Sequence, residues 1–173
     1  MIVFRDPSEV PADFGPSVVA IGKFDGVHSG HRAVLDRARV DAATGDARVA
    51  AVTFDRNPLA LLRPELCPED LIGVHQKVQL LAETGIDATL VLRFDEELAN
   101  LTAREFVQRV LVDALRVRTV MVGADFRFDP PTFEPFPLPS LAVCGTGKRV
   151  GSHENMTYFR CLACARIWAE RRA

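Results

Sequence analysis

The sequence has no excess of positive charge, no long apolar run and no basic leader. With 21 Lys and Arg against 23 Asp and Glu, its formal net charge is −2, so there is no basic field to attract nucleic acid or an anionic membrane. No apolar run reaches the roughly 18 residues of a membrane-spanning helix. The N-terminus, MIVFRDPSEV, carries acids and a proline where a secretory signal is basic and then apolar. We therefore expect a cytoplasmic protein that binds neither nucleic acid nor membrane, with its four cysteines as reduced thiols.

The composition changes near residue 129. Of the 173 residues, 48% are hydrophobic, which suits one globular domain. Residues 1–128 hold 15 basic and 19 acidic side chains, whereas residues 129–173 hold 6 and 4. Five of the eleven prolines lie in DPPTFEPFPLPS (129–140), and three of the four cysteines follow it. We therefore expect two segments, 1–128 and an atypical Pro/Cys-containing tail, 129–173.

Before residue 129, strands and helices alternate. Apolar β-branched runs predict strands, and apolar residues at helical spacing among charges predict helices. The last helix opens with a capping box, Thr102 and Glu105, next to an apolar pair suited to a hydrophobic staple, Leu101 and Phe106. This alternation predicts an α/β fold with a Rossmann-like, doubly wound parallel sheet. The expected strands are 17–24, 48–54, 88–94 and 118–126, and the expected helices are 31–43, 74–84 and 102–115.

The segment GKFDGVHSGH (22–31) leaves the first expected strand and enters the first helix. In open α/β sheets ligands bind at this edge. Glycines at 22, 26 and 30 allow a phosphate to approach the backbone, and the helix start offers unpaired N–H groups and a positive dipole end. His28, just before the helix, and His31, in its first turn, are placed to face the same phosphate. A shared anion favours their protonated forms, which stabilise charge developing on phosphate oxygens.

Other interpretations of this segment fit less well. Two histidines at i and i+3 form half of a zinc site, but only Asp25 stands nearby as a further ligand type. The segment is neither the G-x-G-x-x-G of dinucleotide sites nor a phosphate loop ending in Gly-Lys-Ser/Thr. Because Ser29 lacks an elbow motif and Cys67 lies in a proline-flanked loop, we favour direct in-line transfer with metal help over a covalent intermediate.

These motifs resemble a known family. The pattern His28-Ser-Gly-His31 after a first strand is similar to the H-x-G-H signature of Rossmann-like nucleotidyltransferases. The longer GKFDGVHSGH resembles the FMN adenylyltransferase domain of the bacterial bifunctional riboflavin kinase/FAD synthetase. TFDRNP (53–58), VGADFRF (122–128) and LTAREFV (101–107) resemble further motifs of that domain, in the same order. The likeness covers residues 1–128.

The resemblance implies transfer of AMP from ATP to FMN, giving FAD and pyrophosphate with Mg²⁺. It assigns the ATP phosphates and the transition state to His28 and His31. The loop around the nucleotide would consist of Gly22, Phe24, Asp25, Gly26 and Gly30. The flavin would contact Asn57, Pro58, Asp125 and Phe128. Phe54, at a strand end, suits either a flat ring or the core.

The chain also departs from the family pattern. After Phe128 it reads Asp129-Pro130-Pro131 where the family has glycine and a basic segment, and it shows neither an I-S-S-T-x-I-R-like phosphate clamp nor a riboflavin kinase domain. We therefore expect the tail to replace the rest of the domain and the activity to be impaired. Two alternatives stay open: a catalytically weak flavin- or nucleotide-binding fragment, and another H-x-G-H transferase. An incomplete sheet edge would also favour self-association.

The tail offers weak signals of its own. The pair Cys161-x-x-Cys164, with Cys144 and His153, has zinc-ligand types, but one C-x-x-C pair is a weak indication. In MTYFRCLACARIWAERR (156–172) apolar residues recur at near-helical spacing, which favours a helix with a core-facing stripe.

Overall fold

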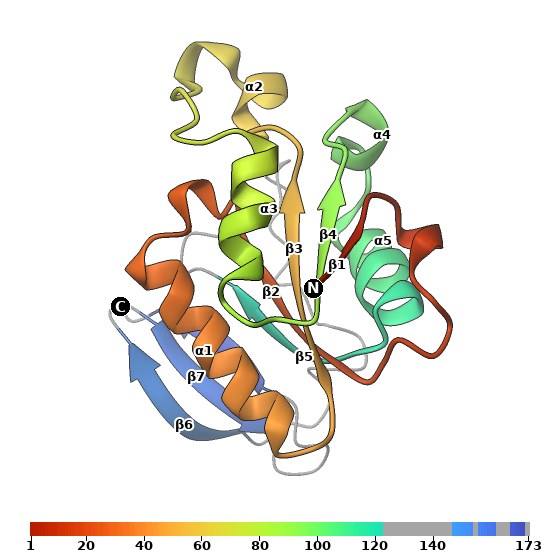
Figure 1. Ribbon diagram of the computed structural model, residues 1–173, viewed down its shortest axis with the longest axis vertical. Coiled ribbons are helices and arrows are strands. Elements are labelled where there is room, and N and C mark those ends of the chain that lie inside the picture. Colours follow the sequence, from red (N-terminus) through yellow and green to blue (C-terminus); the bar gives the residue numbers. More distant parts are fainter. Residues whose placement is uncertain (123–146, 154–155, 162–166, 172–173) are drawn as a thin grey trace.

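The computed structural model describes residues 1–122, 147–153, 156–161 and 167–171. Five strands form a parallel sheet in the order β1-β4-β3-β2-β5 (Figure 1). These strands are β1 (Ile2–Phe4), β2 (Ser17–Ile21), β3 (Arg48–Phe54), β4 (Ala88–Leu92) and β5 (Val117–Val122). The predicted parallel α/β sheet is therefore confirmed, with one strand more than expected. The sequence analysis missed β1, which has only three residues.

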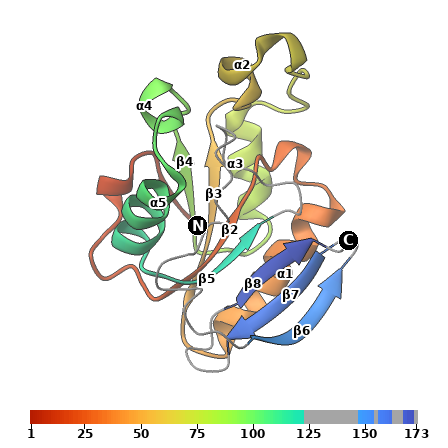
Figure 2. The ribbon, with the colours of Figure 1, turned by 180° about the vertical axis from the view of Figure 1, so that it is seen from behind.

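Helices connect the strands and cover both faces of the sheet (Figures 1 and 2). The longest is α1 (Ser29–Ala43), which connects β2 to β3. The others are short: α2 (Leu59–Leu62), α3 (Val74–Ala82), α4 (Glu96–Ala99) and α5 (Ala103–Phe106), which continues as the π-helical η4 (Val107–Ala114). Three 3₁₀ turns complete this part of the chain: η1 (Pro7–Glu9), η2 (Asp25–Val27) and η3 (Pro64–Leu66). Among the described residues, no helix is long and apolar enough to cross a bilayer.

Alternating residues of the central strand β2 face two separate cores. Val18 and Ala20 pack with Leu35 of α1 and Leu81 of α3, whereas Val19 belongs to the opposite cluster. Every residue of β2 is buried, as expected for a parallel strand covered on both faces. The cluster that contains Val19 also includes Ile21, Val52, Leu90, Leu92, Phe106, Val110 and Leu111. Each fully buried Val or Leu contributes about 1.5–3 kcal/mol relative to an exposed one, so packing on both faces fixes β2 and its exit.

The predicted capping box at the start of α5 is present. Thr102 Oγ1 accepts the N–H of Glu105, and the Glu105 carboxylate accepts the N–H of Thr102. These bonds to the carboxylate hold the pKa of Glu105 below its usual value. Phe106 is buried, and Leu101 packs against the same cluster, where a hydrophobic staple places them. The sequence prediction at this helix start is therefore confirmed.

In the tail, strands occupy positions where the sequence favoured a helix. β6 (Gly147–His153), β7 (Met156–Cys161) and β8 (Ile167–Arg171) form an antiparallel sheet, in which His153 pairs with Met156. The helical prediction for 156–172 is therefore wrong for 156–161 and 167–171. Thr157, Tyr158 and Phe159 belong to the residue types with the highest strand propensity, which outweighed the apolar spacing. Cys144 and Cys164 lie outside the described residues.

Candidate active site

The backbone between β2 and α1 makes a tight turn at the carboxyl edge of the sheet. Phe24 (φ 50°) and Val27 (φ 40°) adopt left-handed conformations, as does Gly26 (φ 75°). Such conformations are unfavourable for a bulky or β-branched residue. Both side chains are only 2% exposed, and the Thr53 hydroxyl donates to the carbonyl of Lys23 (3.0 Å). Core packing and β3 therefore hold the turn in a conformation that its own residues disfavour.

This turn brings His28 and His31 together. Their imidazole rings are stacked, with centroids 3.8 Å apart and planes at 22°. His28 is exposed and is the N-cap residue of α1, although its side chain makes no capping hydrogen bond. A Cβ added at Gly30 would lie 3.2 Å from His28 Cε1, so a side chain at position 30 would press against this ring. The paired rings stand at the positive end of a 15-residue helix, where an anion is favoured.

His31 is deprotonated at neutral pH in the ligand-free protein. Burial, then the charge of His28 and that of Lys77, lower its pKa to about 4, although Asp25 acts in the opposite direction. Its Nδ1 is buried without a hydrogen-bond partner among the described residues. Its ring packs against that of Phe24, with the two ring centroids 5.1 Å apart. An anion bound beside His31 would supply the missing partner and raise this pKa.

Asp25 organises the neighbouring loop. Its carboxylate accepts the N–H groups of Leu71 (3.0 Å) and Ile72 (3.2 Å). Gly26 lies against the same loop, since an added Cβ would be 3.5 Å from Leu71 Cδ1. Gly22 lies against the ring of Phe24, which is itself buried in the core. Of the residues expected to surround a nucleotide, Phe24 and Asp25 thus support the loop from within, whereas Gly30 lies beside His28.

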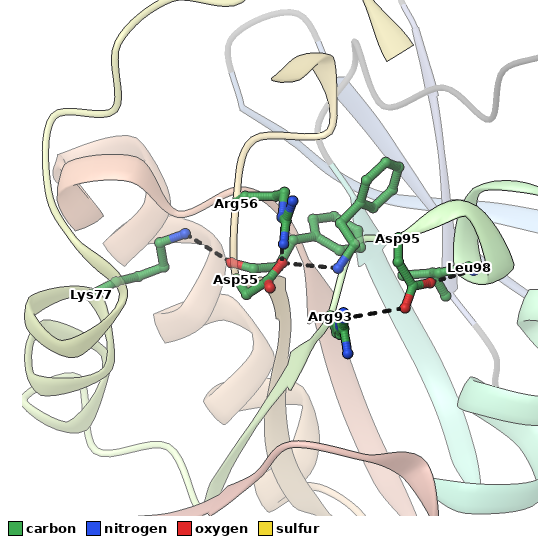
Figure 3. Close-up of polar contacts among 8 residues, drawn as sticks. Asp55, Arg56, Lys77, Arg93, Asp95 and Leu98 are labelled. Carbon is green, nitrogen blue, oxygen red and sulfur yellow. Dashed lines mark hydrogen bonds and ion pairs between the residues drawn. The ribbon is translucent and has the colours of Figure 1, made fainter. Parts of the chain in front are cut away.

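The exit of β3 forms the other side of the edge (Figure 3). Asp55 Oδ1 accepts the N–H of Phe94 (2.9 Å), and the Arg56 side chain lies 3.6 Å from the same oxygen. Asn57 is buried, and its Oδ1 accepts the N–H of Leu59 (3.1 Å). Pro58, the N-cap of α2, is half-buried. These contacts give the 55–59 turn a defined shape.

Phe54 is part of the core. It is 8% exposed and packs edge-to-face on Phe94, with ring centroids 5.4 Å apart. The core interpretation of Phe54 therefore holds, and this ring is not free to stack on a flavin. Asp125 and Phe128, the other two residues expected at the flavin, lie outside the described residues.

Lys77 lies at this edge of the sheet too, although no sequence motif pointed to it. This lysine of α3 is 7% exposed, and its ammonium donates to the carbonyl of Phe54 (3.2 Å) (Figure 3). Burial lowers its pKa, whereas the negative charges of Asp70, Asp25 and Asp55 act to raise it. A signal was present: in VHQKVQLLA, Lys77 lies four residues before the buried Leu81. Positions four apart are neighbours on a helix, so the stem of Lys77 borders the apolar face.

A parallel α/β sheet with paired histidines at the start of its first long helix defines a nucleotidyltransferase-like fold. The sequence model of the family described as FAD synthetase matches residues 10–131. The chain belongs to the FAD synthetase family.

Curated relatives agree with this assignment. The chain is 41% identical over 111 residues to the "Bifunctional riboflavin kinase/FMN adenylyltransferase" of Escherichia coli K12, a match that covers 64% of the chain and 36% of the relative. The Pseudomonas fluorescens protein of the same name is also 41% identical over 111 residues, which are 35% of its length. The match thus spans about a third of these relatives.

Among solved structures, a Streptococcus pneumoniae protein titled "Macrolide-efflux Protein" superposes with a TM-score of 0.61 at 24% identity. The superposition covers 73% of the chain and 42% of that protein. At this identity the likeness concerns the fold alone.

Proposed function

We propose that this chain is an FMN adenylyltransferase, which transfers AMP from ATP to FMN in the cytoplasm and releases FAD and pyrophosphate. The observation that carries the proposal is the stacked pair His28 and His31 at the start of α1, in a chain of the FAD synthetase family. In this reaction a phosphate oxygen of FMN attacks the α-phosphorus of ATP. The bond from that phosphorus to the oxygen bridging to the β-phosphate breaks, and pyrophosphate leaves.

The two histidines would act on the charge that develops during this displacement. His28 is exposed and His31 lacks a partner for Nδ1 among the described residues, so a ring nitrogen of each is available to donate a hydrogen bond to phosphate oxygens. The N–H groups of the first turn of α1 add donors aimed at the same place. Fixed donors of this kind stabilise a transition state because they need no reorganisation as charge moves.

Mg²⁺ belongs to the substrate in this proposal. Among the described residues, no group of three or more His, Cys, Asp or Glu side chains is placed to hold a metal. The nearest carboxylate in the turn, Asp25, is engaged with the N–H groups of Leu71 and Ile72. The residues described do not form a site for the ion, so Mg²⁺ would arrive with the phosphates of ATP.

The flavin would lie beside the 55–59 turn. Asn57 and Pro58 shape this turn, and we retain them, with Asp125 and Phe128, as the proposed flavin contacts. Gly22, Phe24, Asp25, Gly26 and Gly30 form the proposed nucleotide loop.

The test is FAD synthesis by the purified chain with FMN and MgATP, followed by chromatography. We expect FAD to form, and His28→Ala and His31→Ala to lower the rate by about 10²–10³-fold each, as for other lost transition-state donors. His75→Ala is the matched control, because His75 is an exposed histidine of α3.

The alternatives give different results. FMN or ATP binding without FAD formation would support a catalytically weak flavin- or nucleotide-binding fragment. Consumption of ATP with another phosphorylated acceptor, but not with FMN, would support a different H-x-G-H transferase.

A further inference from the structure

Lys77 is a buried cation that the proposed reaction has not used. It is 7% exposed, and one of its N–H groups donates to the Phe54 carbonyl at 3.2 Å. Within the part of the chain that the structure describes, no carboxylate lies within ion-pair distance of its ammonium. A lysine ammonium has three donors. The negative charges of Asp70, Asp25 and Asp55 act on this one only from beyond ion-pair distance, and burying a charge without a direct partner is costly.

The ammonium is bound at the end of β3, and its helix, α3, also contacts the turn before His28. Phe54 is the last residue of β3 and directly precedes the 55–59 turn, and α3 packs against η2, which leads to His28. Figure 3 shows the Lys77 side chain extending from α3 toward the end of β3. Its charge also reaches His31, whose pKa it lowers. Lys77 therefore adds positive charge at the edge where the histidines stand.

An anion bound there would compensate both groups. It would offer the buried ammonium a counter-charge and offer His31 Nδ1 its missing partner. We propose that Lys77 is a further binding residue of the phosphate site, where its ammonium contacts the phosphate chain of the bound nucleotide together with His28 and His31. This inference rests on the proposed function, because it takes the anion to be the polyphosphate of ATP.

The wild-type protein provides the first test. The chain has three lysines, at 23, 77 and 148, so selective labelling of lysine side chains with ¹³Cε and ¹⁵Nζ gives a simple spectrum, in which Lys77→Arg identifies the Lys77 signal. Titration with inorganic pyrophosphate, and separately with MgATP, should shift that signal in a saturable manner. A Lys77 signal that stays unchanged while either ligand binds would overturn the inference.

Affinity measurements provide the second test. By calorimetry, Lys77→Met should weaken binding of pyrophosphate and MgATP by about tenfold or more, the effect of losing one charged hydrogen bond. Lys77→Arg, which keeps the charge, should retain most of the affinity. Arg104→Met, at an exposed position on α5, is the matched control for loss of one positive charge. Equal affinities for Lys77→Met and the wild type would contradict the proposal.

A structural role alone predicts something else. If Lys77 only ties α3 to β3, Lys77→Met should lower the melting temperature and leave the affinities for pyrophosphate and MgATP unchanged. If its charge acts at the phosphate site, both affinities should fall in Lys77→Met and be kept in Lys77→Arg. In either case the pKa of His31, followed by NMR, should rise in Lys77→Met, because the charge of Lys77 lowers it. If Lys77→Met does not fold, the NMR titration of the Lys77 signal in the wild-type protein decides whether the inference stands.

These outcomes separate the inference from the proposed function. Pyrophosphate that shifts the Lys77 signal in a protein that makes no FAD would retain the phosphate site and reject the reaction. FAD synthesis with unaltered MgATP affinity in Lys77→Met would retain the reaction and reject the role of Lys77. Absence of binding by either ligand would reject both.

Discussion

The carboxylate of Asp25 accepts the backbone N–H of Leu71, 46 residues further along the chain, at 3.0 and 3.1 Å from its two oxygens. This contact links the turn before the histidines to the loop before α3. Leu71 is 76% exposed, so its side chain contributes little to holding the loop. The loop therefore depends on the carboxylate.

Replacing Asp25 by alanine should free this loop. Loss of the acceptor leaves the N–H groups of Leu71 and Ile72 to water, and we expect local stability to fall by about 1–2 kcal/mol. Hydrogen exchange of residues 71–73 should accelerate, while that of β2 stays slow. Asp36→Ala, which removes an exposed carboxylate from α1, is the control. Unchanged exchange at 71–73 would contradict the role assigned to Asp25.

Gly30→Ala should impair nucleotide binding without destabilising the fold. Its Cβ would lie 3.2–3.3 Å from the His28 ring, which must shift, whereas alanine itself favours the helix by up to about 1 kcal/mol. We expect the melting temperature to stay level or rise while the KM for MgATP increases severalfold. Gly73→Ala, where an added Cβ meets nothing within 4 Å, should leave KM unchanged. Equal KM values for MgATP in Gly30→Ala and Gly73→Ala would refute the idea that a side chain at position 30 disturbs the His28 ring.

His31 should make the protein less stable in mild acid. Its folded pKa, about 4, lies below the ordinary histidine value of 6.5, so the unfolded chain binds more protons between these values and stability falls as the pH drops from about 6.5 to 4. Allowing for partial solvent screening, the effect is on the order of 2 kcal/mol. Denaturant unfolding of His31→Gln should lack this part of the pH dependence, and His75→Gln, at an exposed position, should keep it. Identical pH profiles for the wild type and His31→Gln would disprove it.

Self-association through a sheet edge stays a prediction, and the structure indicates an edge to test. β1 pairs with β4 alone in the described sheet, and its Ile2 and Val3 are 53% and 37% exposed. Unpaired, apolar edge strands favour association. Light scattering after size exclusion should show a concentration-dependent mass that Val3→Lys lowers. A stable monomer at all concentrations would count against it.

Much of the fold was readable from the sequence because its central elements follow simple patterns. β3 runs from Arg48 to Phe54, as its β-branched run predicts, and the Thr102 capping box marks the start of α5. β1 was missed because three residues show no period. The π-helical turn from Val107 to Ala114 was missed because its hydrogen bonding leaves no mark on apolar spacing.

The site was readable in part. The sequence placed His28 and His31 beside each other, but not the stacking of their rings or the low pKa of His31, which arises mainly from burial. Lys77 escaped notice because a lysine in an amphipathic helix is usually solvated. Its burial depends on how α3 lies against the end of β3, which only three-dimensional packing determines.

The strand order also bears on how this domain forms during synthesis. The histidine turn follows β2, and β2 needs partners on two sides: β3, which comes soon after it, and β5, whose Val117–Val122 pairs with Ser17–Ile21 about a hundred residues later. A ribosome-bound chain that stops short of Val122 would carry the H-x-G-H segment beside a half-paired, largely apolar strand. Chaperone engagement with nascent chains should therefore persist until that last partner has left the exit tunnel.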